Sequence, residues 1–233
     1  MDTRTQAMQR SRPIMNRFKA RRAVALWWWR THRRSIFKRL IDIAAVGAGM
    51  VAAAPILIIV AIFIKAHDRG PVLFWQRRVG KDGKEFDFPK FRSMIVDAER
   101  ARLAIEKANH HGDDAITFKL KRDPRVTPIG RIIRRTSVDE LPQLWCVLKG
   151  DMSLVGPRPA LVSEVARYNQ KDRERLSVTP GLTCIWQVSG RSDVAFPEQV
   201  EMDLEYIRGH SLWSDIKLLL ATLSAIIGGR GAY

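Results

Sequence analysis

Two adjacent carboxylates, Asp139 and Glu140, stand within a few residues of three arginines in the segment 131–142. Carboxylates grouped with guanidinium groups suit a site that acts on an anionic, phosphate-bearing substrate. The pair is therefore a candidate catalytic centre. A structural role competes with this interpretation, because Ser137 and Glu140 have the spacing of a capping box, in which both residues would only close the start of a helix.

A second candidate is the loop Gly156-Pro157-Arg158-Pro159, in which an arginine is fixed between two prolines. Prolines restrict the backbone, so the loop should present its N–H groups and the fork-shaped guanidinium of Arg158 in a defined arrangement. Such an arrangement suits a bound phosphate. The alternative is an ordinary surface turn.

Several common sites are missing from the sequence. It contains no Walker A motif, no GxGxxG after a strand, no HExxH and no GxSxG. The two cysteines, Cys146 and Cys184, have neither CxxC nor metal-ligand spacing. The usual nucleotide-binding loops, a zinc module and a disulfide-built scaffold are therefore not indicated.

The elements that must position these residues follow from local patterns. Residues 72–78 and 85–94 are rich in Val, Phe and Trp and flank the turn pair Asp82-Gly83, which predicts a β-hairpin. From Leu212 to Ile227, apolar residues recur at helical spacing and predict an amphipathic helix. This helix either packs on the core or lies in a lipid interface with Trp213 as an anchor.

A membrane segment precedes this domain. Between Asp42 and Lys65 the chain has 22 residues without a charge, which as a helix would be ~33 Å long against a hydrocarbon thickness of ~30 Å. Pro55 stands near its middle, and basic residues flank both ends. Because the positive-inside tendency draws both flanks to the cytoplasm, we expect a re-entrant helix-hairpin over 36–66, broken at Pro55. A spanning helix with a proline kink is the alternative.

Charge is concentrated at the start of the chain. Of a net charge of +16 over 233 residues, the first 40 residues carry +11, from twelve basic residues against one acid, and include Trp27, Trp28 and Trp29. Basic and aromatic residues together suit an anionic membrane surface, so residues 1–35 are predicted to be a lipid-binding extension. An RNA-binding tail is the alternative. Residues 67–233 are then the catalytic domain.

Five segments resemble the bacterial sugar transferases, a family of monotopic phosphoglycosyl transferases that link a sugar phosphate to polyprenyl phosphate. The segments occur in the family's order within 37–233: GPVLFWQRRVGKDGK from residue 70, KFRSM from residue 90, DPRVTPIGRIIRRTSVDELPQL from residue 123, LKGDMSLVGPRPAL from residue 148 and TPGLTCIWQVSGR from residue 179. The chain is most similar to the members that start exopolysaccharide assembly from UDP-galactose or UDP-glucose.

The resemblance implies a mixed α/β, mainly helical fold with a β-hairpin, a re-entrant membrane helix and interfacial amphipathic helices. It implies that Asp139 attacks the UDP-sugar, forming an aspartyl-phosphosugar and releasing UMP, and that Glu140 assists. It places phosphate-binding cations at Lys90, Arg134 and Arg158. Mg²⁺ is the implied cofactor, with Asp139 as ligand and Glu140 as a further candidate.

The implied partners are a UDP-hexose, undecaprenyl phosphate and anionic lipid, with no nucleic acid and with a homodimer as an open option. The implied location is the cytoplasmic face of a bacterial inner membrane. One departure is Ala54 before Pro55, where members often carry serine. A non-catalytic membrane adaptor of polysaccharide assembly is the alternative function, and the sequence does not identify the hexose.

Overall fold

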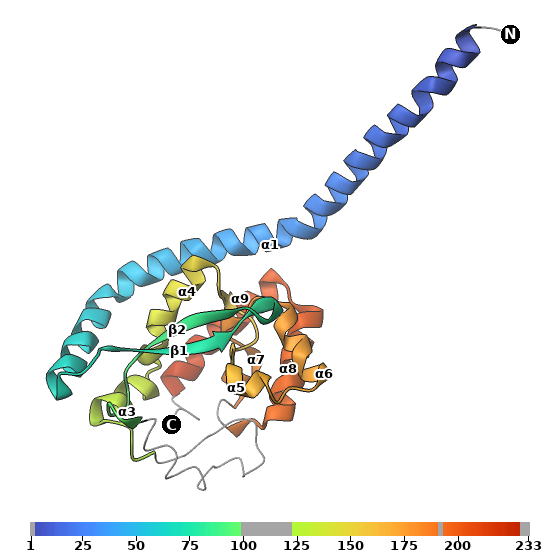
Figure 1. Ribbon diagram of the computed structural model, residues 1–233. Helices are drawn as coiled ribbons and strands as arrows, with labels where there is room; N and C mark the ends of the chain where they lie inside the picture. The colour runs from blue at the N-terminus through green and yellow to red at the C-terminus, as the bar shows by residue number, and fades with distance from the viewer. Residues whose placement is uncertain (1–2, 99–122, 191–192, 229–233) are drawn as a thin grey trace. The chain divides into compact units, whose positions relative to one another are not determined.

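The computed structural model of the chain describes residues 3–98, 123–190 and 193–228, and it is mainly helical with a small amount of β-structure (Figure 1). The chain divides into two compact units, 1–41 and 42–233. The first unit is helical from Thr3 onward, as the beginning of helix α1 (Thr3–Asp68). The second unit holds all candidate site residues, and the mixed, mainly helical fold expected from the sequence is confirmed there.

The predicted β-hairpin is present as strands β1 (Leu73–Val79) and β2 (Glu85–Phe91), which pair antiparallel from Leu73–Phe91 to Val79–Glu85. The turn between them is the short 3-10 helix η1 (Lys81–Gly83). Asp82 and Gly83 there have φ values of 56° and 77°, a conformation that Asp and Gly adopt more readily than bulky residues. Strand β4 (Ala160–Leu161) joins the other edge of β1 and gives the order β2-β1-β4.

A second, parallel pair consists of β3 (Ser153–Val155) and β5 (Gly181–Thr183). All three residues of β3 are buried. The main apolar core lies around this pair and the hairpin, and includes Phe88, Val147 and Met152, each less than 2 % exposed. The other elements connect these strands: α3 (Pro128–Arg135), η3 (Val138–Gln143), α4 (Leu144–Lys149), α5 (Val162–Val165), α6 (Gln170–Arg173), η4 (Glu174–Ser177), α7 (Ile185–Ser189), α8 (Phe196–Gly209) and α9 (Leu212–Gly228).

The helical assignment of α1 continues through Pro55, and the predicted break of the membrane segment at this residue stays a prediction. A proline inside a helix removes one backbone hydrogen bond, and an apolar helix can tolerate that loss with a kink instead of a break. Among the described residues, one helical segment, 36–68, is long and apolar enough to cross a membrane, with a mean hydropathy of 2.6. The re-entrant course of this segment stays a prediction.

The second-unit part of α1 has two different faces. Val46 and Ile64 are buried in the core of the domain, with Met50 and Leu57 packed beside them at helical spacing. The opposite face exposes large apolar side chains along its whole length: Ile43, Val51, Ile56, Ile58, Ile59, Ile62 and Phe63. One face is therefore fixed on the domain while the other remains available to a non-aqueous environment.

The C-terminal amphipathic helix is also confirmed, as α9. Leu218 and Leu219 pack against the core, so the helix lies on the domain. Its other face exposes Trp213, Leu220 and Leu223. Packing and exposure are thus combined in one helix, and placement in a lipid interface stays a prediction.

Candidate active site

The carboxylate pair follows a sharp turn of the backbone. Helix α3 ends at Arg135, Ser137 adopts a left-handed conformation with φ 57° and ψ 17°, and η3 begins at Val138 with Asp139 and Glu140 in its first turn. A non-glycine residue in this region is uncommon and costs on the order of 1 kcal/mol. Since the Ser137 side chain caps nothing, the capping-box interpretation is wrong, and the turn instead directs the two acids inward.

Glu140 is held by two cations from distant parts of the chain. Arg158 donates to both carboxylate oxygens, with Nη1 to Oε2 at 3.3 Å and Nη2 to Oε1 in closer contact. Lys90 Nζ, at the end of β2, lies 3.5 Å from Oε1. These three side chains are only 16 to 22 % exposed, so their mutual attraction is weakly screened by solvent. The structure therefore brings together three residues that the sequence analysis singled out.

Asp139 has a different environment. It is 7 % exposed, and within the described ranges no side chain or backbone group donates a hydrogen bond to its carboxylate. Burial and, second, the negative charge of Glu140 raise the pKa of Asp139 to about 6, against the opposing effect of the nearby cations. A carboxylate with this pKa is mostly ionised at neutral pH but is neither neutralised nor blocked by a partner.

Burial alone would also raise the pKa of Glu140, but the charges of Arg158 and Lys90 and their hydrogen bonds outweigh burial and hold it well below its usual value. Burial in turn lowers the pKa of Lys90 to about 8, against the opposing effect of Glu140. The pKa of Arg158 is raised, because the charge of Glu140 more than offsets burial. The environment thus moves the pKa values of the two neighbouring acids apart: that of Glu140 is lowered and that of Asp139 is raised.

The Arg158 loop is fixed by backbone contacts. The Gly156 N–H donates to the Thr183 carbonyl at 3.0 Å, and the Gly181 N–H donates to the Pro157 carbonyl at 2.8 Å. A Cβ atom on Gly181 would lie 2.0 Å from the Gly156 nitrogen, so only glycine allows the two segments to approach this closely. The loop is therefore built into the second sheet and is more than a surface turn.

Arg78, in β1, is a site residue that the sequence analysis missed. Its Nη1 donates to the Pro159 carbonyl at 2.9 Å, while Nε and Nη2 both donate to Gln76 Oε1. Burial and, second, the charge of Arg158 lower the pKa of Arg78 to about 10. The signal was present in the adjacent pair Arg77-Arg78, because successive side chains of a strand face opposite sides of the sheet. Sequence alone did not show which of the two faces the site.

Arg134 lies in the last turn of α3, half-buried. Its charge lowers the pKa of Asp139, but in the part of the chain that the structure describes it makes no hydrogen bond to either acid. The predicted phosphate-binding residues are therefore placed in two ways: Lys90 and Arg158 contact Glu140, while Arg134 acts on Asp139 through its charge alone. Their phosphate-binding roles stay predictions.

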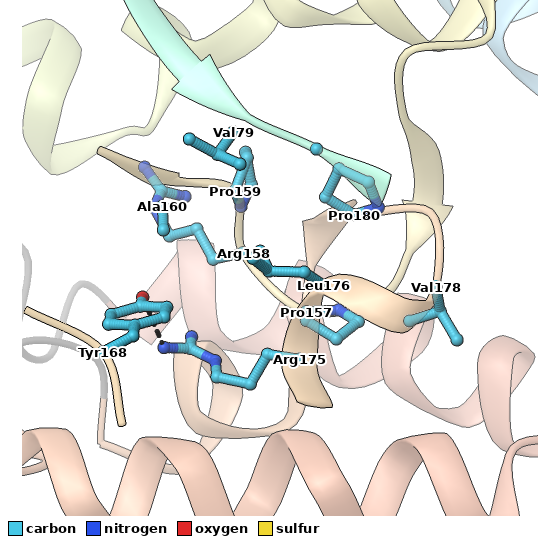
Figure 2. A pocket seen from close by; sticks show the side chains of 11 residues that line it. Val79, Pro157, Arg158, Pro159, Ala160, Tyr168, Arg175, Leu176, Val178 and Pro180 are labelled. Carbon is cyan, nitrogen blue, oxygen red and sulfur yellow. Dashed lines mark hydrogen bonds between the residues drawn. The ribbon is translucent and has the colours of Figure 1, made fainter. Parts of the chain in front are cut away.

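A small pocket of about 230 Å³, including the part open to solvent, lies beside the Arg158 loop (Figure 2). Its walls are the loop, the end of β1 and η4. Figure 2 also shows Arg175 donating to the Tyr168 hydroxyl, and Arg175 is further paired with the buried Asp203. Tyr168 and Arg175 thus line the same pocket as the Arg158 loop.

The donor set for a metal ion is small. The residues that the structure describes include no group of three or more His, Cys, Asp or Glu side chains that could hold a metal. Mg²⁺ commonly binds through one or two carboxylates together with waters and substrate phosphates. Asp139, whose carboxylate has no hydrogen-bond donor among the described residues, fits such a partial site, whereas the oxygens of Glu140 are already engaged by cations.

Comparison with known proteins shows the family of the chain. The family model described as bacterial sugar transferase matches residues 33–229. The galactosyl transferase CpsE of Streptococcus agalactiae is 47 % identical over 201 residues, which are 84 % of this chain and 43 % of the relative. The undecaprenyl-phosphate galactose phosphotransferase of Salmonella typhimurium is 42 % identical over 202 residues, covering 84 % of this chain and 41 % of the relative.

The chain thus spans about two fifths of the length of these two relatives. It spans 88 % of the exopolysaccharide production protein ExoY of Rhizobium meliloti, with 36 % identity over 201 residues and 84 % of this chain covered. The matched region in each case includes the membrane segment and the carboxylate pair. The chain belongs to the bacterial sugar transferase family.

Proposed function

We propose that the protein transfers hexose-1-phosphate from a UDP-sugar to undecaprenyl phosphate, releasing UMP and starting exopolysaccharide assembly. The observation that carries this proposal is a pair of neighbouring acids in different environments. Asp139 is buried and accepts no hydrogen bond from any residue that the structure describes, whereas Glu140 contacts Arg158 and Lys90. Two of the relatives named above, from Streptococcus agalactiae and Salmonella typhimurium, carry galactosyl or galactose in their names. Another relative, from Klebsiella pneumoniae, is named for UDP-glucose and undecaprenyl phosphate. A UDP-hexose, galactose or glucose, is therefore the proposed donor.

The reaction proceeds in two displacements. A carboxylate oxygen of Asp139 forms a bond to the sugar-bearing phosphorus, and the bond from that phosphorus to the bridging oxygen breaks, so UMP leaves with the bond's electrons. A phosphate oxygen of undecaprenyl phosphate then bonds to the same phosphorus and releases the carboxylate. Both steps bring anions together, and Arg158, Lys90 and Arg78 supply the opposing charge.

Glu140 is best suited to a positioning role. With its pKa held well below the usual value by Arg158 and Lys90, it has little capacity to donate or accept a proton near neutral pH. Its charge instead fixes the two cations where a diphosphate can meet them. Asp139, with Glu140 as a second candidate, would hold Mg²⁺, which supplies Lewis-acid neutralisation of phosphate charge when bound.

The membrane segment is proposed to enter and leave the bilayer on the cytoplasmic face. Near one end of the segment, Asp42 Oδ2 accepts a hydrogen bond from Ser153; at the other end, Asp68 pairs with Arg92. Both Ser153 and Arg92 belong to the same domain. A helix with its ends on opposite sides of a bilayer cannot hold both contacts, which favours the re-entrant course over a spanning helix.

The basic extension 1–35 is proposed to add affinity for anionic lipid.

The re-entrant course is tested by cysteine labelling. A single cysteine placed near residue 30 and another placed near Lys84 should both react with a membrane-impermeant thiol reagent only after the cytoplasmic side is opened. Reaction of the first from outside and of the second from inside would instead establish a spanning helix.

The function is tested with the purified protein in lipid nanodiscs. UDP-galactose or UDP-glucose with undecaprenyl phosphate should yield UMP, and UDP-sugar without the lipid acceptor should leave a hexose-phosphate adduct on Asp139, measured by intact mass and peptide mapping. Asp139→Asn should give neither product while remaining folded. Absence of UMP with every UDP-sugar tested would instead favour the non-catalytic adaptor.

A further inference from the structure

Asp42 is a buried acid that takes no part in the site described above. It is 4 % exposed, and its Oδ2 accepts a hydrogen bond from the Ser153 hydroxyl at 2.7 Å. Ser153 is itself 5 % exposed and is the first residue of β3. A buried carboxylate is costly unless it is hydrogen-bonded, so this contact fixes the start of β3 to the apolar helix α1.

The other end of β3 is held in a similar way. The Tyr206 hydroxyl, from α8, lies 3.0 Å from the Val155 carbonyl and 2.9 Å from Asp215 Oδ1 of α9. Tyr206 and Asp215 are both buried. Strand β3 therefore has polar contacts at both ends to helices outside its own sheet.

The partner strand β5 has a third contact of this kind. The Thr183 and Thr222 hydroxyls lie 2.7 Å apart and join β5 to α9. The carbonyl of the same Thr183 accepts the Gly156 N–H. The two strands are thus fixed to α1 and α9, the two helices whose opposite faces expose large apolar side chains.

Strand β3 leads directly into the loop that carries Arg158. Ser153 precedes Arg158 by five residues, and the intervening backbone is held by the Gly156–Thr183 and Gly181–Pro157 hydrogen bonds. A rigid connection of this length transmits a shift at Ser153 to the guanidinium that holds Glu140.

We propose that Asp42 is a positioning residue for Arg158: by holding β3 through Ser153, it sets the guanidinium against the carboxylate pair. The apolar helix then does more than attach the protein to lipid, because its seating on the domain determines the geometry of the site. This inference rests on the proposed function for its kinetic test, but its structural test is independent of that function.

The kinetic test is a double-mutant cycle in nanodiscs with UMP release as the readout. Asp42→Ala should lower kcat/KM by roughly 10- to 100-fold, the loss expected from a small misplacement of a catalytic group. In an Arg158→Lys background, the same change should cost less than about twofold, since its effect passes through Arg158. Ser153→Ala should reproduce both results, and Asp42→Asn, which keeps an oxygen acceptor, should stay within about threefold of wild type.

Val46→Ala is the matched control. Val46 lies one turn further along α1 and is 1 % exposed, so its truncation loosens the same helix without removing the hydrogen bond. Its effect should be the same factor in the wild-type and Arg158→Lys backgrounds. Hydrogen–deuterium exchange over residues 153–161 should accelerate more in Asp42→Ala and Ser153→Ala than in Val46→Ala, which leaves the hydrogen bond in place although Val46 packs in the same core as Leu154 and Val155.

Equal losses for Asp42→Ala in the two backgrounds, or unchanged exchange over 153–161, would overturn the proposal. Asp42→Asn as impaired as Asp42→Ala would also overturn it, because the hydrogen bond would not be the cause. If Asp42→Ala fails to fold, the Ser153→Ala pair decides the kinetics. A wild-type protein that releases no UMP refutes the proposed function, and the exchange measurement then decides the positioning role alone.

Discussion

Neutralising the two adjacent acids one at a time should change stability in opposite directions. Burial and the charge of Glu140 raise the pKa of Asp139 from 3.8 to about 6, so its ionised form is disfavoured in the folded protein by roughly two pKa units at about 1.4 kcal/mol each. Asp139→Asn removes this cost and should stabilise the fold by up to about 3 kcal/mol at neutral pH, or roughly 6 to 12 °C in Tm for a domain of this size.

Glu140→Gln should have the opposite effect. The pKa of Glu140 is lowered by Arg158 and Lys90 in excess of the effect of burial, so its ionised form stabilises the folded state. Removing the charge leaves two largely buried cations without their partner, which should cost about 2 kcal/mol or more. The two isosteric changes at neighbouring positions serve as controls for each other.

The pH dependence of the stability gain in Asp139→Asn is a second test of the same reasoning. The pKa of Asp139 is 3.8 in the unfolded chain and about 6 in the folded protein, so the gain of Asp139→Asn should be nearly complete at pH 7.5, shrink as pH falls toward 4 and vanish at still lower pH. Thermal unfolding of the three proteins in one detergent at pH 4, 5, 6 and 7.5 measures this. Tm changes of the same sign for both variants at pH 7.5, or a gain in Asp139→Asn that is as large at pH 4 as at pH 7.5, would refute the electrostatic separation of the pair.

Four further predictions concern activity. The rate of UMP release should rise as pH increases through about 6, where Asp139 ionises, and fall above about 8, where Lys90 loses its proton; a flat profile from pH 5 to 9 would contradict this. Arg158→Ala should lower kcat/KM, measured by steady-state kinetics, by a factor that corresponds to a loss of transition-state stabilisation on the order of 1.5 to 3 kcal/mol. An unchanged kcat/KM would leave the loop without a part in catalysis. Arg78→Ala should lower kcat/KM at least tenfold because the Pro159 carbonyl loses its donor. The control is Arg77→Ala: the exposed side chain of Arg77 pairs with Glu85 and Asp87 on the sheet surface, so this change should alter kcat/KM less than twofold. EDTA should abolish UMP release and added Mg²⁺ should restore it; full activity in EDTA would remove the metal from the proposal.

Local patterns predicted the parts of the fold that depend on neighbouring residues. The hairpin of β1 and β2 and helix α9 were recognised because apolar spacing and the Asp82-Gly83 turn act over a few residues. The same local reasoning failed at Ser137, where a left-handed turn replaces the expected helix cap. At Pro55 the helical assignment is continuous, and the expected break stays a prediction.

The site depends on contacts between distant residues, which local patterns do not contain. Lys90 and Glu140 are 50 residues apart, and Arg158 is 18 residues from Glu140; their grouping was expected only from the family resemblance. The Asp42–Ser153 hydrogen bond joins residues 111 apart. Nothing near Asp42 in the sequence distinguishes a buried, hydrogen-bonded acid from one that merely ends an apolar segment.

Charge balance explains why the site needs cations from several elements. Arg78, Lys90 and Arg158 come from β1, β2 and the loop after β3. Glu140 is hydrogen-bonded to Lys90 and Arg158, whereas Arg78 donates to Gln76 and to the Pro159 carbonyl. One carboxylate cannot neutralise all three cations, so positive charge remains for an anionic substrate. Because Asp139 stays outside this pairing, its oxygens remain available for the proposed attack on phosphorus, and its raised pKa favours that role because a more basic carboxylate is a better nucleophile. A site with both acids equally paired would be more stable and would leave no carboxylate for the nucleophilic role that we propose.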